Sequence, residues 1–77
     1  MNEGVVVYVE LLDEGTTVWR PTTAYRLDEK ILILSNENYH AETETWAVSP
    51  GSLITIEQKQ LADGPVGVAK RYEKSVP

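Results

Sequence analysis

The chain has 77 residues, which is enough for one small domain that buries roughly 60% of the surface of its unfolded chain. It contains no cysteine, so its fold has no disulfide or thiolate–metal site, and its composition suits a reducing compartment. The net charge of −5 argues against nucleic acids and anionic membranes as partners, because both are bound mainly through Lys and Arg.

The first two expected elements form a β-hairpin. Residues 5–12 alternate as a strand whose odd-numbered side chains, from Val5 to Leu11, are predicted to face the core. Asp13-Glu14-Gly15 ends this strand, with Gly15 as the candidate for a positive φ angle. Residues 17–27 are a second predicted strand. Pro21 cannot donate a ladder hydrogen bond, so we expect it at a sheet edge or a bulge.

Residues 30–34 follow a polar break at Asp28-Glu29 and are apolar on both faces, which indicates a strand inside a closed or curled sheet. Residues 35–44 are polar and form the longest predicted loop, and residues 45–48 are predicted to be a short strand.

Ser49-Pro50-Gly51 has the pattern of a type II turn. Residues 53–57 form the next predicted strand, with Ile54 and Ile56 on one face. Residues 58–60 lead to a turn at Asp63-Gly64-Pro65, and residues 66–70 form the last predicted strand.

These elements predict an all-β single domain over residues 1–77, with an ordered core at about residues 4–70 and a frayed tail at 71–77. No window has the apolar spacing of a long helix. Five or six short strands fit a small antiparallel SH3-like barrel, and fit an oligonucleotide/oligosaccharide-binding barrel less well. A barrel this small can leave one edge open, so we expect a monomer or a weak homodimer through an edge strand.

No pattern of catalytic or metal-ligating residues stands out. The single histidine, His40, has only Glu37, Glu42 and Glu44 nearby, which is a poor ligand set for zinc or calcium. The chain has no nucleophile elbow and no glycine-rich phosphate loop. We therefore expect a non-enzymatic protein without a cofactor or a metal.

Charge and aromatic residues indicate a partner-binding face instead. Residues 1–50 hold nine acids and three bases, whereas residues 51–77 hold three acids and four bases. Trp46 follows Glu42 and Glu44, and a tryptophan beside carboxylates can accept an Arg or Lys by cation–π contact and charge pairing. Tyr39 and Tyr8 are candidates to extend this surface into a peptide groove. The alternative is that Trp46 fills the core of a chain that has no phenylalanine.

Trp19 and Arg20 are the second pair of candidate site residues, and Trp19 is equally consistent with core and with ligand surface. Arg20 lies between Trp19 and Pro21, and we expect it to pair with a carboxylate such as Asp13 or Glu14 and to stack on Trp19. The alternative is that Arg20 binds an anionic ligand.

The resulting hypothesis is a small acidic interaction domain that binds a basic partner protein or peptide through an acidic, tryptophan-containing face; an inhibitor or immunity-type protein is one specific version of it. The predicted face consists of Trp46, Glu42, Glu44, Tyr39, Trp19 and Arg20. The alternative function is a small-molecule or peptide-binding barrel with its site between the Trp46 loop and Trp19. The start of the chain lacks the basic region of a secretory signal, and its longest apolar run, residues 5–9, is too short for a membrane span, so we expect a cytoplasmic protein.

The segments Leu11-Leu12-Asp13-Glu14-Gly15 and Val18-Trp19-Arg20-Pro21 resemble the signature of a group of very small bacterial proteins of unknown function. The similarity continues at Ala24 and Leu27, at Glu44-Thr45-Trp46 before Pro50-Gly51, and around Leu61, Gly64, Val68 and Ala69. The chain departs from the pattern at Thr22, where an apolar residue is usual, and at Asp28-Glu29, where a glycine-containing turn is usual. The resemblance implies a stand-alone, cytoplasmic, single-domain protein with no established activity.

Overall fold

The computed structural model describes residues 4–62 and 64–73, and these contain six strands and no helix. The strands are β1 (Gly4–Leu12), β2 (Val18–Arg26), β3 (Leu32–Leu34), β4 (Thr45–Trp46), β5 (Leu53–Leu61) and β6 (Gly64–Arg71). The all-β prediction is therefore confirmed. No helix in the described ranges is long and apolar enough to cross a membrane.

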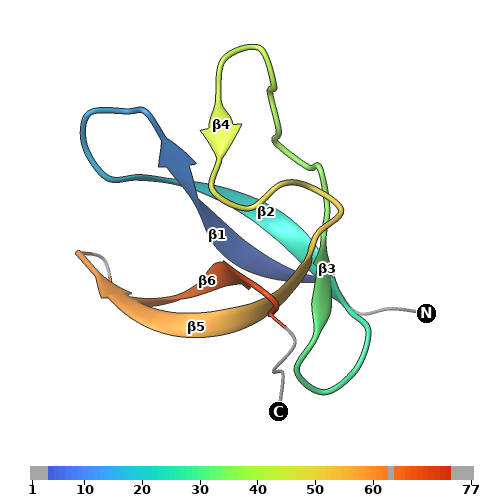
Figure 1. Ribbon diagram of the computed structural model, residues 1–77. Helices are drawn as coiled ribbons and strands as arrows, with labels where there is room; N and C mark the ends of the chain where they lie inside the picture. Colours follow the sequence, from blue (N-terminus) through green and yellow to red (C-terminus); the bar gives the residue numbers. More distant parts are fainter. Residues whose placement is uncertain (1–3, 63, 74–77) are drawn as a thin grey trace.

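Five of the strands close into a small barrel (Figure 1). β1–β2, β2–β3, β3–β5 and β5–β6 pair antiparallel, and β6 returns to β1 through a parallel pairing at Tyr8 and Val68. The parallel pairing follows from the strand count, because strand direction alternates around the barrel from β1 through β2, β3 and β5 to β6, and the first and fifth of five alternating strands run the same way. The barrel is consistent with the predicted SH3-like class, but its sheet is mixed rather than wholly antiparallel.

The sixth strand, β4, extends the sheet beyond the barrel. It pairs with the end of β1 through Leu11–Trp46 and Leu12–Thr45, and the Ala47 amide donates to the Glu10 carbonyl at 2.9 Å. The β1–β2 turn and the loop over residues 35–44 consequently lie at the same end of the molecule (Figure 1).

The core lies inside the barrel and follows the predicted alternation. Val7, Val9 and Leu11 on β1 are buried, as the odd-face prediction requires. Side chains from the other strands and from the segment that follows β4 complete the cluster: Ala24, Leu32, Leu34, Trp46, Val48, Ile54 and Ala69. Burial of this apolar surface is the main source of stability in a chain without disulfides.

Pro21 lies at a sheet edge and not at a bulge. The β1–β2 register runs without interruption from Gly4–Tyr25 to Leu11–Val18, and β3 pairs with β2 only from Ala24 onward. The Pro21 carbonyl accepts a hydrogen bond from Asn38 Nδ2, so this residue's backbone polar groups point away from β1. The missing N–H of Pro21 therefore removes no bond from the β1–β2 ladder.

Two predicted turns have the expected backbone. Gly15 has a φ of 76°, and Gly51 has a φ of 86°, with the Ser52 amide donating to the Ser49 carbonyl at 3.2 Å. Both glycines have positive φ angles, which are sterically unfavourable for residues that carry a Cβ atom. Asp13 also has a positive φ, of 61°, in the first turn.

The last hairpin is longer than the sequence predicts. β5 continues through Leu61 and β6 begins at Gly64, whereas strands were expected only over residues 53–57 and 66–70. Gln58, Lys59 and Gln60 are all exposed, so this part of the hairpin lacks the alternating apolar residues from which a strand is predicted. β6 reaches Arg71, and the Tyr72 amide donates to the Leu53 carbonyl at 2.9 Å. Asp63 of the predicted turn and residues 74–77 of the predicted tail lie outside the described residues.

Candidate functional site

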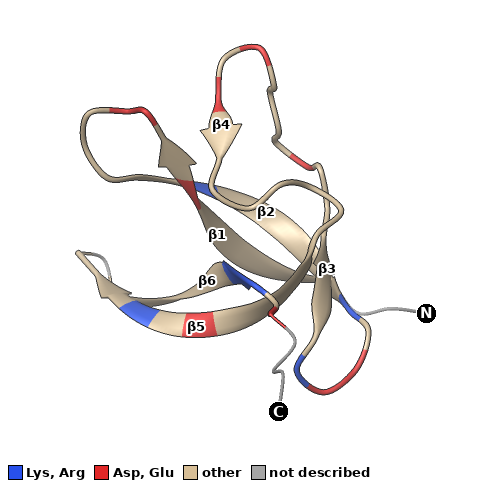
Figure 2. Cartoon of the chain, viewed as in Figure 1, with Lys and Arg blue, Asp and Glu red and all other residues tan. Residues whose placement is uncertain are grey.

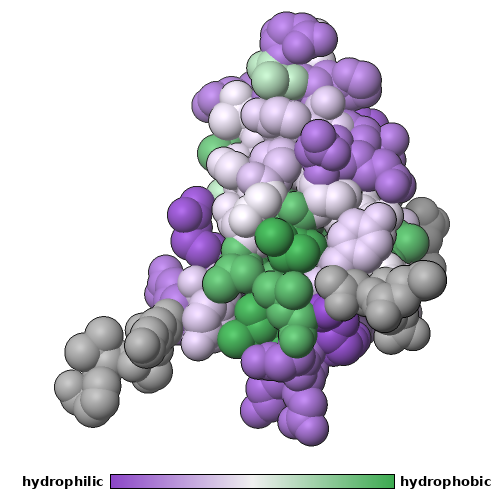
Figure 3. Space-filling view, turned by 90° about the vertical axis from the view of Figure 1, so that its right-hand side faces the viewer, coloured by the Kyte–Doolittle hydropathy of each residue, from purple (hydrophilic) through white to green (hydrophobic). Residues whose placement is uncertain are grey.

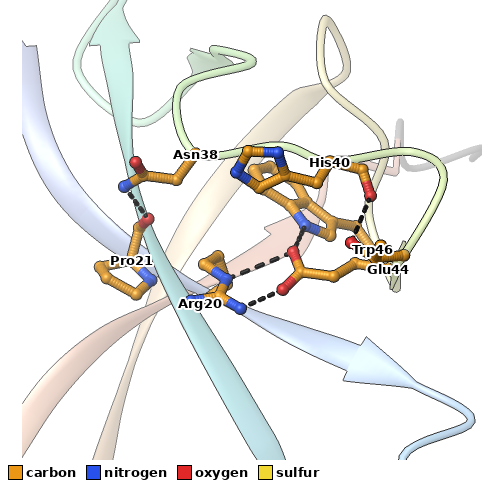
Figure 4. A network of polar contacts seen from close by, with 7 residues as sticks. Arg20, Pro21, Asn38, His40, Glu44 and Trp46 are labelled. Carbon is orange, nitrogen blue, oxygen red and sulfur yellow. Dashed lines mark hydrogen bonds and ion pairs between the residues drawn. The ribbon is translucent and has the colours of Figure 1, made fainter.

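A polar network joins β2 to the end of the loop over residues 35–44 (Figure 4). Arg20 Nε donates to Glu44 Oε1 at 3.2 Å, and Arg20 Nη2 forms a second bond to Glu44 Oε2. The indole N–H of Trp46 also donates to Glu44 Oε1, at 3.3 Å. Glu44 thus binds a guanidinium through two parallel bonds and holds the polar edge of a buried tryptophan, so it acts as the hub of the network.

The same contacts set the electrostatics of the pair. Hydrogen bonding to Arg20 holds the pKa of Glu44 below its usual range, helped by the Trp46 indole and the charges of Arg20 and His40, while burial opposes the shift. Hydrogen bonding to Glu44 in turn raises the pKa of Arg20, again against burial. The side chain of Glu44 is only 9% exposed, whereas that of Arg20 is 38% exposed. Both groups stay charged at neutral pH.

Further bonds fasten the loop along the edge of β2. Thr22, which is buried, donates through Oγ1 to the Glu37 carbonyl at 2.6 Å. Asn38, with a φ of 66°, donates to the Pro21 carbonyl at 2.9 Å, and the Ser35 amide donates to the Thr23 carbonyl at 2.9 Å. The loop therefore covers an edge of β2 that β3 leaves unpaired.

Substitution of Glu44 by glutamine is expected to reduce the pH dependence of stability. The folded pKa of Glu44 is depressed, so its charge stabilises the fold above the unfolded value near 4.5, and this contribution is lost as pH falls through the lower folded value. Urea unfolding at pH 7 and pH 3 measures the change. Glu42→Gln, at an exposed position of the same loop, is the control, and an equal change in both variants would contradict the role given to Glu44.

The network corrects the predicted binding face. Trp46 is 5% exposed and belongs to the core, and Tyr39 packs against it edge-on, with ring centroids 4.9 Å apart and planes at 80°. Glu44 is committed to Arg20 and Trp46. A face containing the ring of Trp46 and a free Glu44 carboxylate is therefore wrong, although Glu42 is exposed as that face requires. Arg20 pairs with a carboxylate as predicted, but the carboxylate is Glu44 and not Asp13 or Glu14.

Trp19 is the tryptophan that reaches the surface. It is half-buried on the outside of the barrel, and Lys59 Nζ lies 5.6 Å from the centre of its ring. A groove of about 440 Å³ runs beside it, between the two long hairpins, with a mainly apolar lining: Tyr8, Thr17, Trp19, Leu61, Ala62 and Val66. Sequence reasoning missed Leu61 and Val66 in this role, because the length of the β5–β6 hairpin was not visible.

A second groove, of about 320 Å³, lies on another side of Trp19. It includes Ala47 and Val48, which follow Trp46, together with five charged residues: Glu10, Glu57, Lys59, Lys70 and Arg71. The predicted position between the Trp46 segment and Trp19 thus contains a groove, of mixed charge.

Exposed acids gather at the end of the barrel that carries the β1–β2 turn and the 35–44 loop (Figure 2). Asp13 and Glu14 lie in the turn, and Glu37 and Glu42 lie in the loop. Arg20 is paired with Glu44 at the end of this loop, and Lys59 lies over the ring of Trp19. A further groove, of about 330 Å³, joins Asp13 and Glu14 to Thr17, which also lines the groove beside Trp19. We call the continuous surface of Asp13, Glu14, Thr17, Trp19 and Tyr8 the acidic tryptophan face.

An apolar patch lies on a different side, over β3 and its neighbours (Figure 3). The strand register places Tyr25, Ile33 and Leu53 in one row across β2, β3 and β5. The three residues of this row carry no carboxylate, imidazole or thiol. No cluster of three or more His, Cys, Asp or Glu side chains that could hold a metal ion occurs within residues 4–62 and 64–73.

Comparisons of the chain with protein-family models, with curated proteins and with solved structures gave no match.

Proposed function

We propose that this chain is a non-enzymatic, cytoplasmic interaction domain that binds a basic segment of another protein through the acidic tryptophan face. The observation that carries the proposal is the shared position of Thr17, which makes the acidic turn and the groove beside Trp19 one surface. An extended segment on this surface would place Lys or Arg side chains near Asp13 and Glu14 and an apolar side chain in the groove between Tyr8 and Trp19.

The electrostatics of this end of the barrel support a basic partner. Arg20 is neutralised by Glu44, and the ion pairs found among the described residues involve none of Asp13, Glu14 and Glu42. Lys59 already lies over the ring of Trp19 at 5.6 Å, which shows that a cation fits there. A small acidic domain that covers a basic surface in this way would act as an inhibitor or immunity-type protein.

Reversing the charge of two acids on this end is expected to abolish capture of the partner from a lysate of the native host. The variant is E14K/E42K, and the matched control is E29K/E73K, which changes the net charge equally at exposed positions elsewhere. Charge reversal next to a basic segment replaces attraction by repulsion, so we expect a loss of at least tenfold in captured protein. Equal capture by both variants would contradict the proposal.

The groove of mixed charge between Val48 and Trp19 favours a second candidate function, a barrel that binds a small molecule or peptide carrying both charges. Glu14 and Glu42 do not line this groove, so a ligand held there would remain bound to the E14K/E42K variant. The capture comparison therefore separates the two functions.

A further inference from the structure

β5 has a long unpaired edge because its two neighbours differ in length. β3 pairs with β5 only at Leu53 and Ile54, whereas β6 pairs with it from Ile54 to Leu61. Beside this edge lie two open grooves of about 460 and 380 Å³, which reach Thr55, Ile56 and Gln58. Residues 55–61 therefore have a paired side, toward β6, and an open side, toward the β2–β3 turn.

The direction of the backbone groups along this edge follows from two hydrogen bonds. The Leu53 carbonyl accepts from Tyr72, which extends β6, and the Ser52 carbonyl accepts from Leu34 on β3. Because alternate residues of a strand point their backbone groups to opposite sides, even-numbered residues face away from β6. Ile56, Gln58 and Gln60 thus direct their N–H and C=O groups to the open side, where the described part of the chain offers no backbone partner.

The exposed edge is complementary to itself. Residues 55–61 have the sequence Thr-Ile-Glu-Gln-Lys-Gln-Leu, with Gln58 at the centre. If a second copy pairs antiparallel about Gln58, that residue exchanges two hydrogen bonds with its own counterpart, and Ile56 and Gln60 pair in the same way. Glu57 then lies directly opposite Lys59 of the other copy, twice, at the positions where side chains approach most closely.

We propose that two copies of this chain associate through β5, antiparallel and about a twofold axis at Gln58. Pairing about residue 57 or 59 would place like charges opposite one another, so the charges disfavour these two neighbouring registers. Their present contacts are weak: Glu57 and Lys70 are 3.9 Å apart with both side chains more than half exposed, and Lys59 lies over Trp19. None of the residues that define the acidic tryptophan face lies on this edge, although Lys59 and Leu61 of β5 border the surroundings of Trp19.

Sedimentation equilibrium of the full chain, from micromolar to millimolar concentration, tests the proposal with two charge variants. The wild type is expected to dimerise, and E57K and K59E each to bind themselves roughly tenfold or more weakly, because two opposite-charge pairs become two like-charge pairs. An equimolar mixture of E57K and K59E is expected to restore the dimer, because every cross-strand pair is then of opposite charge. The double variant E57K/K59E is expected to behave like the wild type.

A cysteine at the axis gives a readout that does not depend on charge. The chain has no cysteine, so Gln58→Cys is expected to form a disulfide-linked dimer under mild oxidation much faster than Thr16→Cys, an exposed control in the β1–β2 turn. Circular dichroism verifies that each variant is folded. A wild type that stays monomeric at millimolar concentration would overturn the proposal, as would equal crosslinking of the two cysteine variants or a failure of the mixture to restore association.

Discussion

Replacement of Trp46 by alanine is expected to remove a large part of the stability of this domain. The side chain is 5% exposed, packs against Tyr39 and has its indole N–H bonded to Glu44. Truncation of a buried tryptophan costs about 3–5 kcal/mol, while a chain of this length has a total stability of roughly 4–12 kcal/mol. Urea unfolding followed by far-ultraviolet circular dichroism measures the loss.

Trp19→Ala is the matched control for that experiment. The same side chain is removed from a half-buried position outside the barrel, so we expect the free energy of unfolding to fall by about 1 kcal/mol at most. Equal losses in the two variants would contradict the assignment of Trp46 to the core and Trp19 to the surface.

Replacement of Ile54 by alanine is expected to lower the free energy of unfolding by about 2–5 kcal/mol. Ile54 has no exposed surface and lies where β5 pairs with both β3 and β6, so its removal leaves a cavity in the middle of the closed sheet. The measurement is again urea unfolding, with the midpoint and slope fitted together so that a change in the unfolded state is recognised.

Leu53→Ala, at the adjacent position, is the control for the Ile54 variant. Leu53 lies on the same strand but faces outward and is 42% exposed, so we expect a loss of less than about 1 kcal/mol. A larger loss for Leu53 than for Ile54 would mean that the inner and outer faces of β5 had been exchanged, since a shift of one residue moves every side chain to the opposite face.

The parts of the fold that could be predicted from sequence are those with an apolar alternation. The odd face of β1, the apolar β3 and the inward position of Ile54 were all visible as patterns, and Gly15 and Gly51 marked their turns. The parallel closure between β1 and β6 was not predicted, although an odd number of alternating strands requires it. The distal half of the β5–β6 hairpin was missed because backbone pairing holds it together and its side chains are polar.

The candidate site was harder to predict, because proximity in the sequence does not show which side chains form hydrogen bonds or ion pairs with one another. The sequence pattern placed Glu44 and Trp46 in one candidate binding face, whereas the hydrogen bonds from Arg20 and from the indole to Glu44 join them in a structural contact. The partner of Arg20 lies 24 residues away, so no local pattern indicates it. The exposure of Trp19 follows from its position on the outer face of β2. The alternation of residues along this strand did not show which of its two faces points outward.

Capture of the partner by the Trp19→Ala variant tests most directly whether the acidic tryptophan face is the binding surface. The variant is expected to remain folded and to unfold cooperatively in urea, because Trp19 lies outside the core. It is expected to lose the partner that the wild type captures from the same lysate. A folded Trp19→Ala variant that captures as much of that partner as the wild type would contradict this assignment.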